Sequence, residues 1–153
     1  MGRGEKRMAK GMLGKVGSWA FLIGILVALI VGLYQAVTYE AALNDVTKAG
    51  DIFFRTDAGA WIAWLLAVLG AIIGILAVLG RGTITQKETP GFLLAGIALL
   101  IMGGVFPVIT QLYPLQPWIG SLFVGLSVSL AIFVAPAVGI LAIKAIWDMG
   151  KDV

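Results

Sequence analysis

The polar side chains within the apolar stretches of this chain could support hydrogen bonding or solute binding. They are amides and hydroxyls, none of which titrates near neutral pH: Gln35, Thr110, Gln111, Ser121, Ser127 and Ser129. The chain contains no cysteine and no histidine. This excludes disulfides, thiolate nucleophiles, Fe–S clusters and Cys-ligated zinc within the chain. It also removes the commonest general base and transition-metal ligand.

Carboxylates gather in one polar segment, where they could bind a cation or cap helices. Asp45, Asp51 and Asp57 are spaced six residues apart, unlike the alternating ligands of an EF-hand loop. The sequence has no P-loop motif, and no serine has a base that could activate it. We therefore expect solvated charges and caps. The sequence predicts no catalytic residue, no metal site and no cofactor, and it does not indicate an enzyme.

The elements that position these side chains are long and apolar. Of the 153 residues, 60% are hydrophobic and only 12% are charged, and the mean hydropathy is +1.02. Charges are absent from 16–39, 58–80 and 89–143. A helix of roughly 20 apolar residues crosses a bilayer, so the third gap has room for two crossings. The sequence predicts an all-α, four-span transmembrane helical bundle, with spans at about 17–37, 58–80, 90–109 and 118–143.

The distribution of cations predicts the orientation of these spans. Of the 11 Lys and Arg residues, only Lys48 and Arg55 fall in the expected external loop, 38–57, which leaves nine on the other side. Cytoplasmic loops carry such an excess. We expect a multi-pass protein of the cell membrane with both termini cytoplasmic. Its organisation is a basic cytoplasmic N-terminal segment, 1–16, and a membrane domain, 17–153. The excess of cytoplasmic cations accounts for the pI of about 9.4, so the basic charge does not require a nucleic-acid partner.

The basic segment has two interpretations. Its cations share one helical stripe opposite Met8, Met12 and Val16, which suits an interfacial helix. Its four glycines instead favour an unstructured tail. Beyond the first span, residues 39–49 predict a helix that ends at Gly50.

Cap and proline signals mark the remaining helix ends. Thr56 or Asp57 is the expected N-cap of the second span. Before the third span, Thr85 with Glu88 has capping-box spacing, and Thr89 followed by Pro90 has the signature of proline in the first turn. We expect Pro107 to bend or end the third span and Pro136 to kink the fourth. A kink at Pro136 fits either a static bundle or a gate.

Small residues recur every three or four positions on two spans. They are Gly24, Ala28 and Gly32 on the first span, and Ala67, Gly70 and Gly74 on the second. Small side chains let helix backbones approach closely in lipid. A bundle of this size has little interior, so we expect these faces to pack helices and also to join copies into a homo-oligomer.

Aromatic residues mark the expected membrane boundaries. We expect Trp61, Trp64, Trp118 and Trp147 to act as interface anchors, because indole rings favour the headgroup region. The apolar residues at 52–54 either dip into the interface or cover the spans.

Two stretches carry a resemblance to a known group. Residues 84–104 contain a Thr-x-Lys-Glu-Thr turn before a span, and residues 131–147 form a proline-kinked last span that ends in a Lys-Ala-Ile run. In these features the chain resembles small uncharacterised archaeal multi-span membrane proteins. The resemblance implies a multi-span membrane fold. That group has no assigned activity, so no functional residue follows from it.

Two function classes fit these observations. The first is a structural or assembly component, either a homo-oligomer or a small subunit of a larger membrane complex. The second is a channel or facilitator for a small uncharged solute. The absence of charge within the spans favours the first, because buried charges usually mark transport pathways. Pro136 and the serines are the features that favour the second. The expected partners are the lipid bilayer and further copies of the chain, and no nucleic acid.

Overall fold

The described part of the chain is almost entirely helical. The computed structural model describes residues 2–80, 84, 87–112 and 117–151. Within these residues the order is α1 (Arg3–Asn44), η1 (Val46–Asp51), η2 (Phe53–Arg55), α2 (Asp57–Val78), α3 (Thr89–Leu112) and α4 (Pro117–Lys151), where η denotes a 3-10 helix. In this part of the chain, four helices are long and apolar enough to cross a membrane. The predicted all-α fold with four such helices is confirmed.

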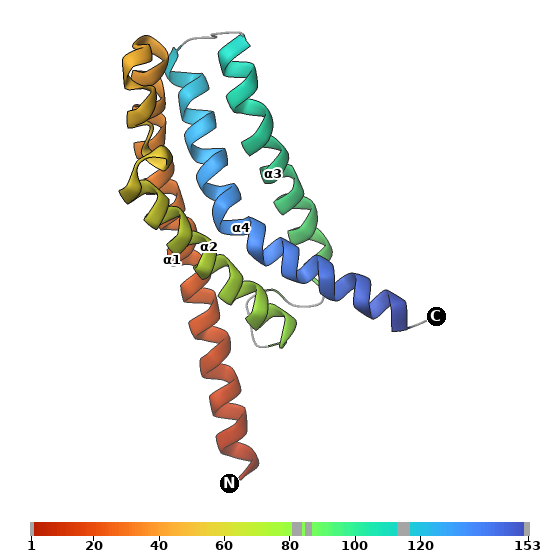
Figure 1. The fold of residues 1–153 in the computed structure, drawn as a ribbon. Helices are drawn as coiled ribbons and strands as arrows, with labels where there is room; N and C mark the ends of the chain where they lie inside the picture. Colours follow the sequence, from red (N-terminus) through yellow and green to blue (C-terminus); the bar gives the residue numbers. More distant parts are fainter. Residues whose placement is uncertain (1, 81–83, 85–86, 113–116, 152–153) are drawn as a thin grey trace.

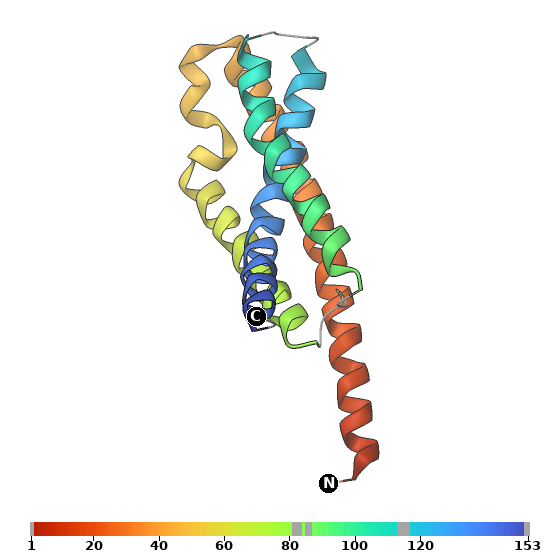
Figure 2. The same ribbon diagram turned by 90° about the vertical axis from the view of Figure 1, so that its right-hand side faces the viewer.

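Helix α4 lies at the centre of the fold. The other three long helices surround it, and each packs far more extensively against α4 than against the others (Figures 1 and 2). Buried residues make up 39% of the most apolar stretch of α4, but only 6% of that of α3. The largest fully buried apolar side chains are Phe133 and Val124 of α4 and Leu66 of α2. The core therefore follows α4, and α3 is the most peripheral span.

Helix α1 is one continuous helix of 42 residues. At 1.5 Å per residue it is about 63 Å long, roughly twice the thickness of the hydrocarbon core. Its N-terminal end extends well beyond the other helices (Figure 1). No helix break separates segment 1–16 from the membrane domain, and the segment is helical from Arg3 onward. Once the apolar span has nucleated a helix, each further residue needs only propagation, which outweighs the weak propensity of glycine.

The far end of α1 differs from the prediction. The sequence predicted a helix to Ala49, but α1 ends at Asn44, because Asp45 has an extended backbone (φ −143°, ψ 107°). The Asp45 carboxylate then accepts a hydrogen bond from the Thr47 N–H at 3.0 Å. This Asp45 cap begins η1 instead of a further turn of α1.

The segment after η1 folds back onto α1. The Phe54 N–H donates to Gln35 Oε1, and the Phe53 N–H donates to Thr38 Oγ1, both at 3.1 Å. The Phe53 ring packs edge-on against Tyr34, with ring centroids 5.0 Å apart. Of the two alternatives for residues 52–54, the structure supports the one in which they cover a span.

The remaining helix boundaries mostly follow the sequence signals. Thr56 is the N-cap of α2, and its side chain accepts the Gly59 N–H. Helix α3 begins at Thr89 and continues through Pro107 to Leu112, so Pro107 does not end it. Membrane helices tolerate an internal proline when neighbouring groups satisfy the freed backbone. Thr85 and residues 113–116 lie outside the described residues.

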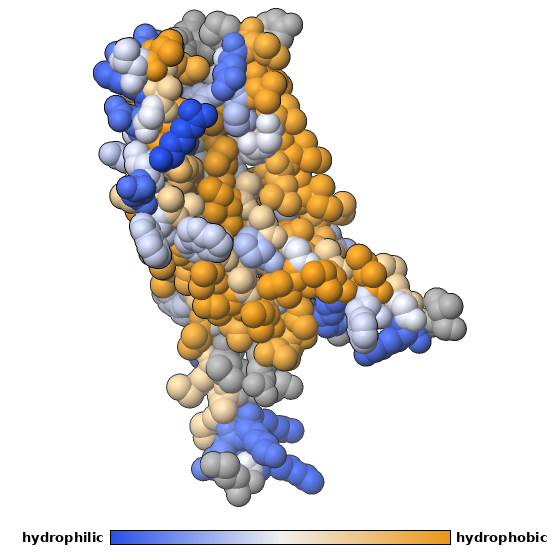
Figure 3. All heavy atoms as spheres, viewed as in Figure 1, coloured by the Kyte–Doolittle hydropathy of each residue, from blue (hydrophilic) through white to orange (hydrophobic). Residues whose placement is uncertain are grey.

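Hydrophilic residues gather at the extremities of the molecule. They lie on the protruding end of α1, around the segment that joins α1 to α2, and near the end of α4, with an apolar surface between them (Figure 3). Many large apolar side chains are exposed on this surface, including Leu26 and Leu94 at 58% and 70%. Such a surface suits contact with lipid rather than water.

Candidate functional site

The small residues of α1 lie against α4 within the same chain. An added Cβ at Gly24 would overlap the Phe133 ring, and one at Gly32 would lie 3.0 Å from the Gly125 oxygen. Residue numbers rise along α1 as they fall along α4, so the two helices are antiparallel. Ala28 and Ser129 lie midway between these two contacts, and both are completely buried at 0% exposure. Gly24, Ala28 and Gly32 therefore pack α1 onto α4.

Sequence reasoning missed the partner of this stripe. On α4, Ser121, Gly125 and Ser129 recur every four residues, and all three are buried. An added Cβ at Gly125 would overlap the Gly32 carbonyl and lie 2.6 Å from the Ala36 nitrogen. The period that revealed the α1 stripe could have revealed this one, but its serines were interpreted as polar groups rather than as small ones.

The small residues of α2 meet the kinked part of α4. An added Cβ at Gly70 would overlap the Phe133 carbonyl and lie 3.6 Å from Pro136 Cδ. At Gly74 the added atom would lie 2.8 Å from Ala137 Cα. Ala67 on the same helix is partly buried. Glycine therefore occupies the positions of α2 that the α4 backbone approaches most closely, because a larger side chain would overlap that backbone.

Helix α3 contacts α4 through two further glycines. An added Cβ at Gly96 would overlap Val138, and one at Gly103 would lie 3.1 Å from Ala131 Cβ. Three helices thus use small residues to approach one central helix. Gly24, Gly32, Gly70 and Gly74 are buried within the chain. They therefore do not offer the free surface for another copy that was expected from the sequence.

Helix α4 changes direction near its middle (Figure 1), and Pro136 lies within it. Proline removes the amide that would bond the carbonyl four residues earlier, which accounts for a kink at this position. That carbonyl belongs to Ile132, and neither nearby serine covers it: Ser127 donates to the Phe123 oxygen one turn before Ser127 itself, and the Ser129 hydroxyl has no hydrogen-bond partner among the described residues. The small, buried side chains of Ser121 and Ser129 instead suit close contact between helices.

The buried polar side chains mostly bond to backbone groups. Thr110 donates to the Phe106 carbonyl, and the Tyr39 hydroxyl donates to the Pro107 carbonyl at 3.2 Å, which links α1 to α3. Among the described residues, the Ser129 hydroxyl is the one buried side-chain group without a hydrogen-bond partner. It lies between packed helices, so these groups do not form a continuous polar path across the described fold.

The charged groups lie outside this core. The hydroxyl of Thr47 donates to Asp45 at 2.6 Å, and this bond, together with that from the Thr47 N–H, lowers the pKa of the Asp45 carboxyl below its ordinary value of 3.8. Lys144 and Asp148 form an ion pair at 2.6 Å. In the described part of the chain, no group of three acidic side chains is arranged to hold a metal ion.

The four tryptophans proposed as anchors are all largely exposed. The exposed fractions are 73% for Trp61, 69% for Trp64, 59% for Trp118 and 66% for Trp147. An interface anchor must be accessible to lipid headgroups, and the exposure of these four side chains meets that requirement. Their place in the headgroup region stays a prediction.

No protein-family model, curated protein or solved structure matches this chain. The resemblance to archaeal multi-span proteins therefore stays an expectation from the sequence, and any function must be argued from the packing of the helices.

Proposed function

We propose that this chain is a structural or assembly component of the cell membrane. It spans the bilayer four times, has both termini in the cytoplasm, and forms a homo-oligomer or a small subunit of a larger complex. One observation carries the proposal. Helix α4 occupies the interior where a single-chain pore would lie, while the outer surface of α3 has little contact within the chain. This arrangement favours contact between chains over transport through one.

The outer surface of α3 supplies the contact in this proposal. Gly91, Ala95 and Ala98 are exposed and recur along one edge of the helix. Among the described residues, no atom lies within 4 Å of a Cβ added at Gly91. Helices associate in lipid through close backbone approach, which such small residues permit. The oligomer contact is therefore assigned to α3 rather than to the small stripes of α1 and α2.

The facilitator alternative has weaker support. It requires a route for a neutral solute, and the buried hydroxyls on α3 and α4 bond mostly to their own helix backbones. A path for the solute between two copies of the chain is compatible with this alternative. Solute flux that appears only in the oligomeric form would favour it.

Cysteine cross-linking tests the assembly, because the natural chain contains no cysteine. We expect a single cysteine at Ala98 to cross-link copies in native membranes. A cysteine at Ile72, which is 48% exposed on α2, serves as the control and should not. In native mass spectrometry, Ala98→Leu should shift the protein toward monomer while it remains inserted. A wild-type protein that is monomeric at every concentration in nanodiscs would refute the proposal.

Labelling tests the orientation. Four crossings place both ends of the chain on the same side, and the cation excess assigns that side to the cytoplasm. A cysteine at Asn44 should react with an impermeant reagent from outside intact cells. A cysteine at Lys87 should react only after permeabilisation. Both positions are exposed, so equal labelling from outside would contradict the four-span arrangement.

A further inference from the structure

The outer face of α2 changes chemically along its length. Asp57, Trp61 and Trp64 occupy one stripe at its start, and apolar side chains continue the stripe at Val68, Ile72 and Ile75. The three aliphatic side chains are 48–50% exposed. The opposite face holds the buried residues of the helix, Gly59, Leu66, Gly70, Ile73 and Gly74. The stripe is therefore not used for packing within the chain.

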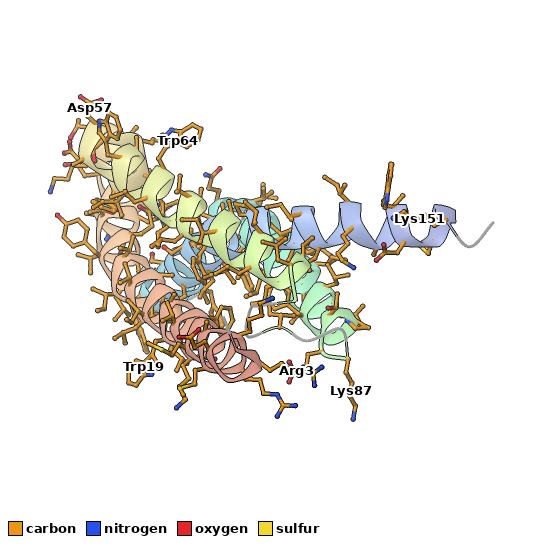
Figure 4. All side chains as sticks on the ribbon, turned by 90° about the horizontal axis from the view of Figure 1, so that it is seen from below. Arg3, Trp19, Asp57, Trp64, Lys87 and Lys151 are labelled. Carbon is orange, nitrogen blue, oxygen red and sulfur yellow. The ribbon has the colours of Figure 1, made fainter. Side chains whose placement is uncertain are left out.

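The start of this stripe forms a shallow hollow. Asp57, Ala60, Trp61 and Trp64 line it, and the small side chain of Ala60 leaves space beside the two indoles. Asp57 and Trp64 both extend outward from the start of α2, away from the other helices (Figure 4). The indoles present most of their surface to the surroundings, at 73% and 69% exposure.

The carboxylate of Asp57 is free to meet a ligand. Thr56, not Asp57, caps α2 by accepting the Gly59 N–H. The nearby cation, Arg55, donates to the Ala49 carbonyl at 3.3 Å. Within the described residues, Asp57 has no ion pair and no hydrogen bond from a side chain. A free carboxylate one turn before Trp61 and two turns before Trp64, on the same stripe, combines the two groups that favour an organic ammonium ion, since indole faces attract cations.

We propose that this stripe binds one membrane lipid whose headgroup carries an ammonium group. The ammonium lies between the Asp57 carboxylate and the indoles of Trp61 and Trp64. The acyl chain follows Val68, Ile72 and Ile75. From Trp64 to Ile75 the helix rises about 16 Å, close to half of the ~30 Å hydrocarbon thickness, so the aliphatic part matches one leaflet. The continuous apolar surface below the hollow favours a lipid over a soluble amine.

Competition between two lipids tests this site. The wild-type protein is placed in nanodiscs with equal amounts of phosphatidylcholine and phosphatidylglycerol of identical acyl chains, and the retained lipids are counted by native mass spectrometry. We expect phosphatidylcholine to be retained preferentially. Trp61→Leu and Trp64→Leu should each lower that preference about two- to five-fold, the range expected for one exposed cation–π contact. Asp57→Asn should also lower it, and Asp57→Glu should preserve it.

Matched substitutions separate the site from general effects. Trp19 is 67% exposed on α1 but has Lys15, not an acid, one turn before it. Trp19→Leu should leave the preference unchanged, as should Asp51→Asn. Equal retention of both lipids by the wild type, or an unchanged preference in Asp57→Asn, would overturn the proposal. Displacement of the bound lipid by millimolar soluble phosphocholine would also overturn it, because that result indicates a site for a soluble amine.

Discussion

Substitution of Gly125 by alanine tests whether the α1–α4 contact holds the fold together. The added Cβ would overlap the Gly32 carbonyl and lie 2.6 Å and 2.8 Å from the nitrogen and Cβ of Ala36. Ordinary contacts of this kind are about 3.5–4.0 Å, so α1 must move away by roughly 1 Å. The neighbouring atoms belong to backbone or to a Cβ, which have no rotamer to adjust. Overpacking of this kind destabilises by about 1–3 kcal/mol.

Gly139→Ala is the matched control, because it lies on the same helix and, among the described residues, has no atom within 4 Å of an added Cβ. Both substitutions gain helix propensity, up to about 1 kcal/mol, so their difference isolates the packing cost. We expect Gly125→Ala to be less stable than Gly139→Ala by about 1–3 kcal/mol. The free energy of unfolding is measured in mixed micelles by titration with a denaturing detergent. Equal stability of the two variants would refute the close approach of α1 and α4.

Three further predictions concern single polar side chains. Ser129→Ala should stabilise the fold by up to about 1–3 kcal/mol in the same titration, since it removes a buried hydroxyl without a partner; a loss of stability would indicate a bond. Tyr39→Phe removes the link from α1 to α3 and should cost about 0.5–1.5 kcal/mol; no change would show that the link is weak. Thr47→Val should raise the pKa of Asp45 toward 3.8 in an NMR titration. Because that pKa is lowered in the fold, the stabilisation by the carboxylate is present above about pH 3.8 and is lost as pH falls through the lowered value; an unchanged titration would contradict this.

The helices themselves were largely predictable from local signals. Hydropathy located the four long helices, and the capping chemistry at Thr56 located the start of α2, because both depend on residues close together in the sequence. The end of α1 was less predictable. The Gly50 signal suggested a later end, but the side chain of Asp45 bonds the Thr47 N–H and terminates the helix earlier. At this boundary the Gly50 signal and the Asp45 cap predict different helix ends, and the sequence alone does not show which of them is stronger.

What the sequence determined is that Gly24, Gly32, Gly70 and Gly74 present faces that another helix can approach closely. Only the tertiary structure decided which helix approaches them, and it is α4 of the same chain in each case. The physical reason is that a stripe of small residues permits close approach by any helix and does not specify which helix packs against it. Hydropathy does not identify the partner helix either, because a side chain that faces lipid and one that faces another helix are equally apolar. The central place of α4 follows from contacts between residues far apart in the sequence, such as Gly32 with Gly125 and Gly70 with Phe133.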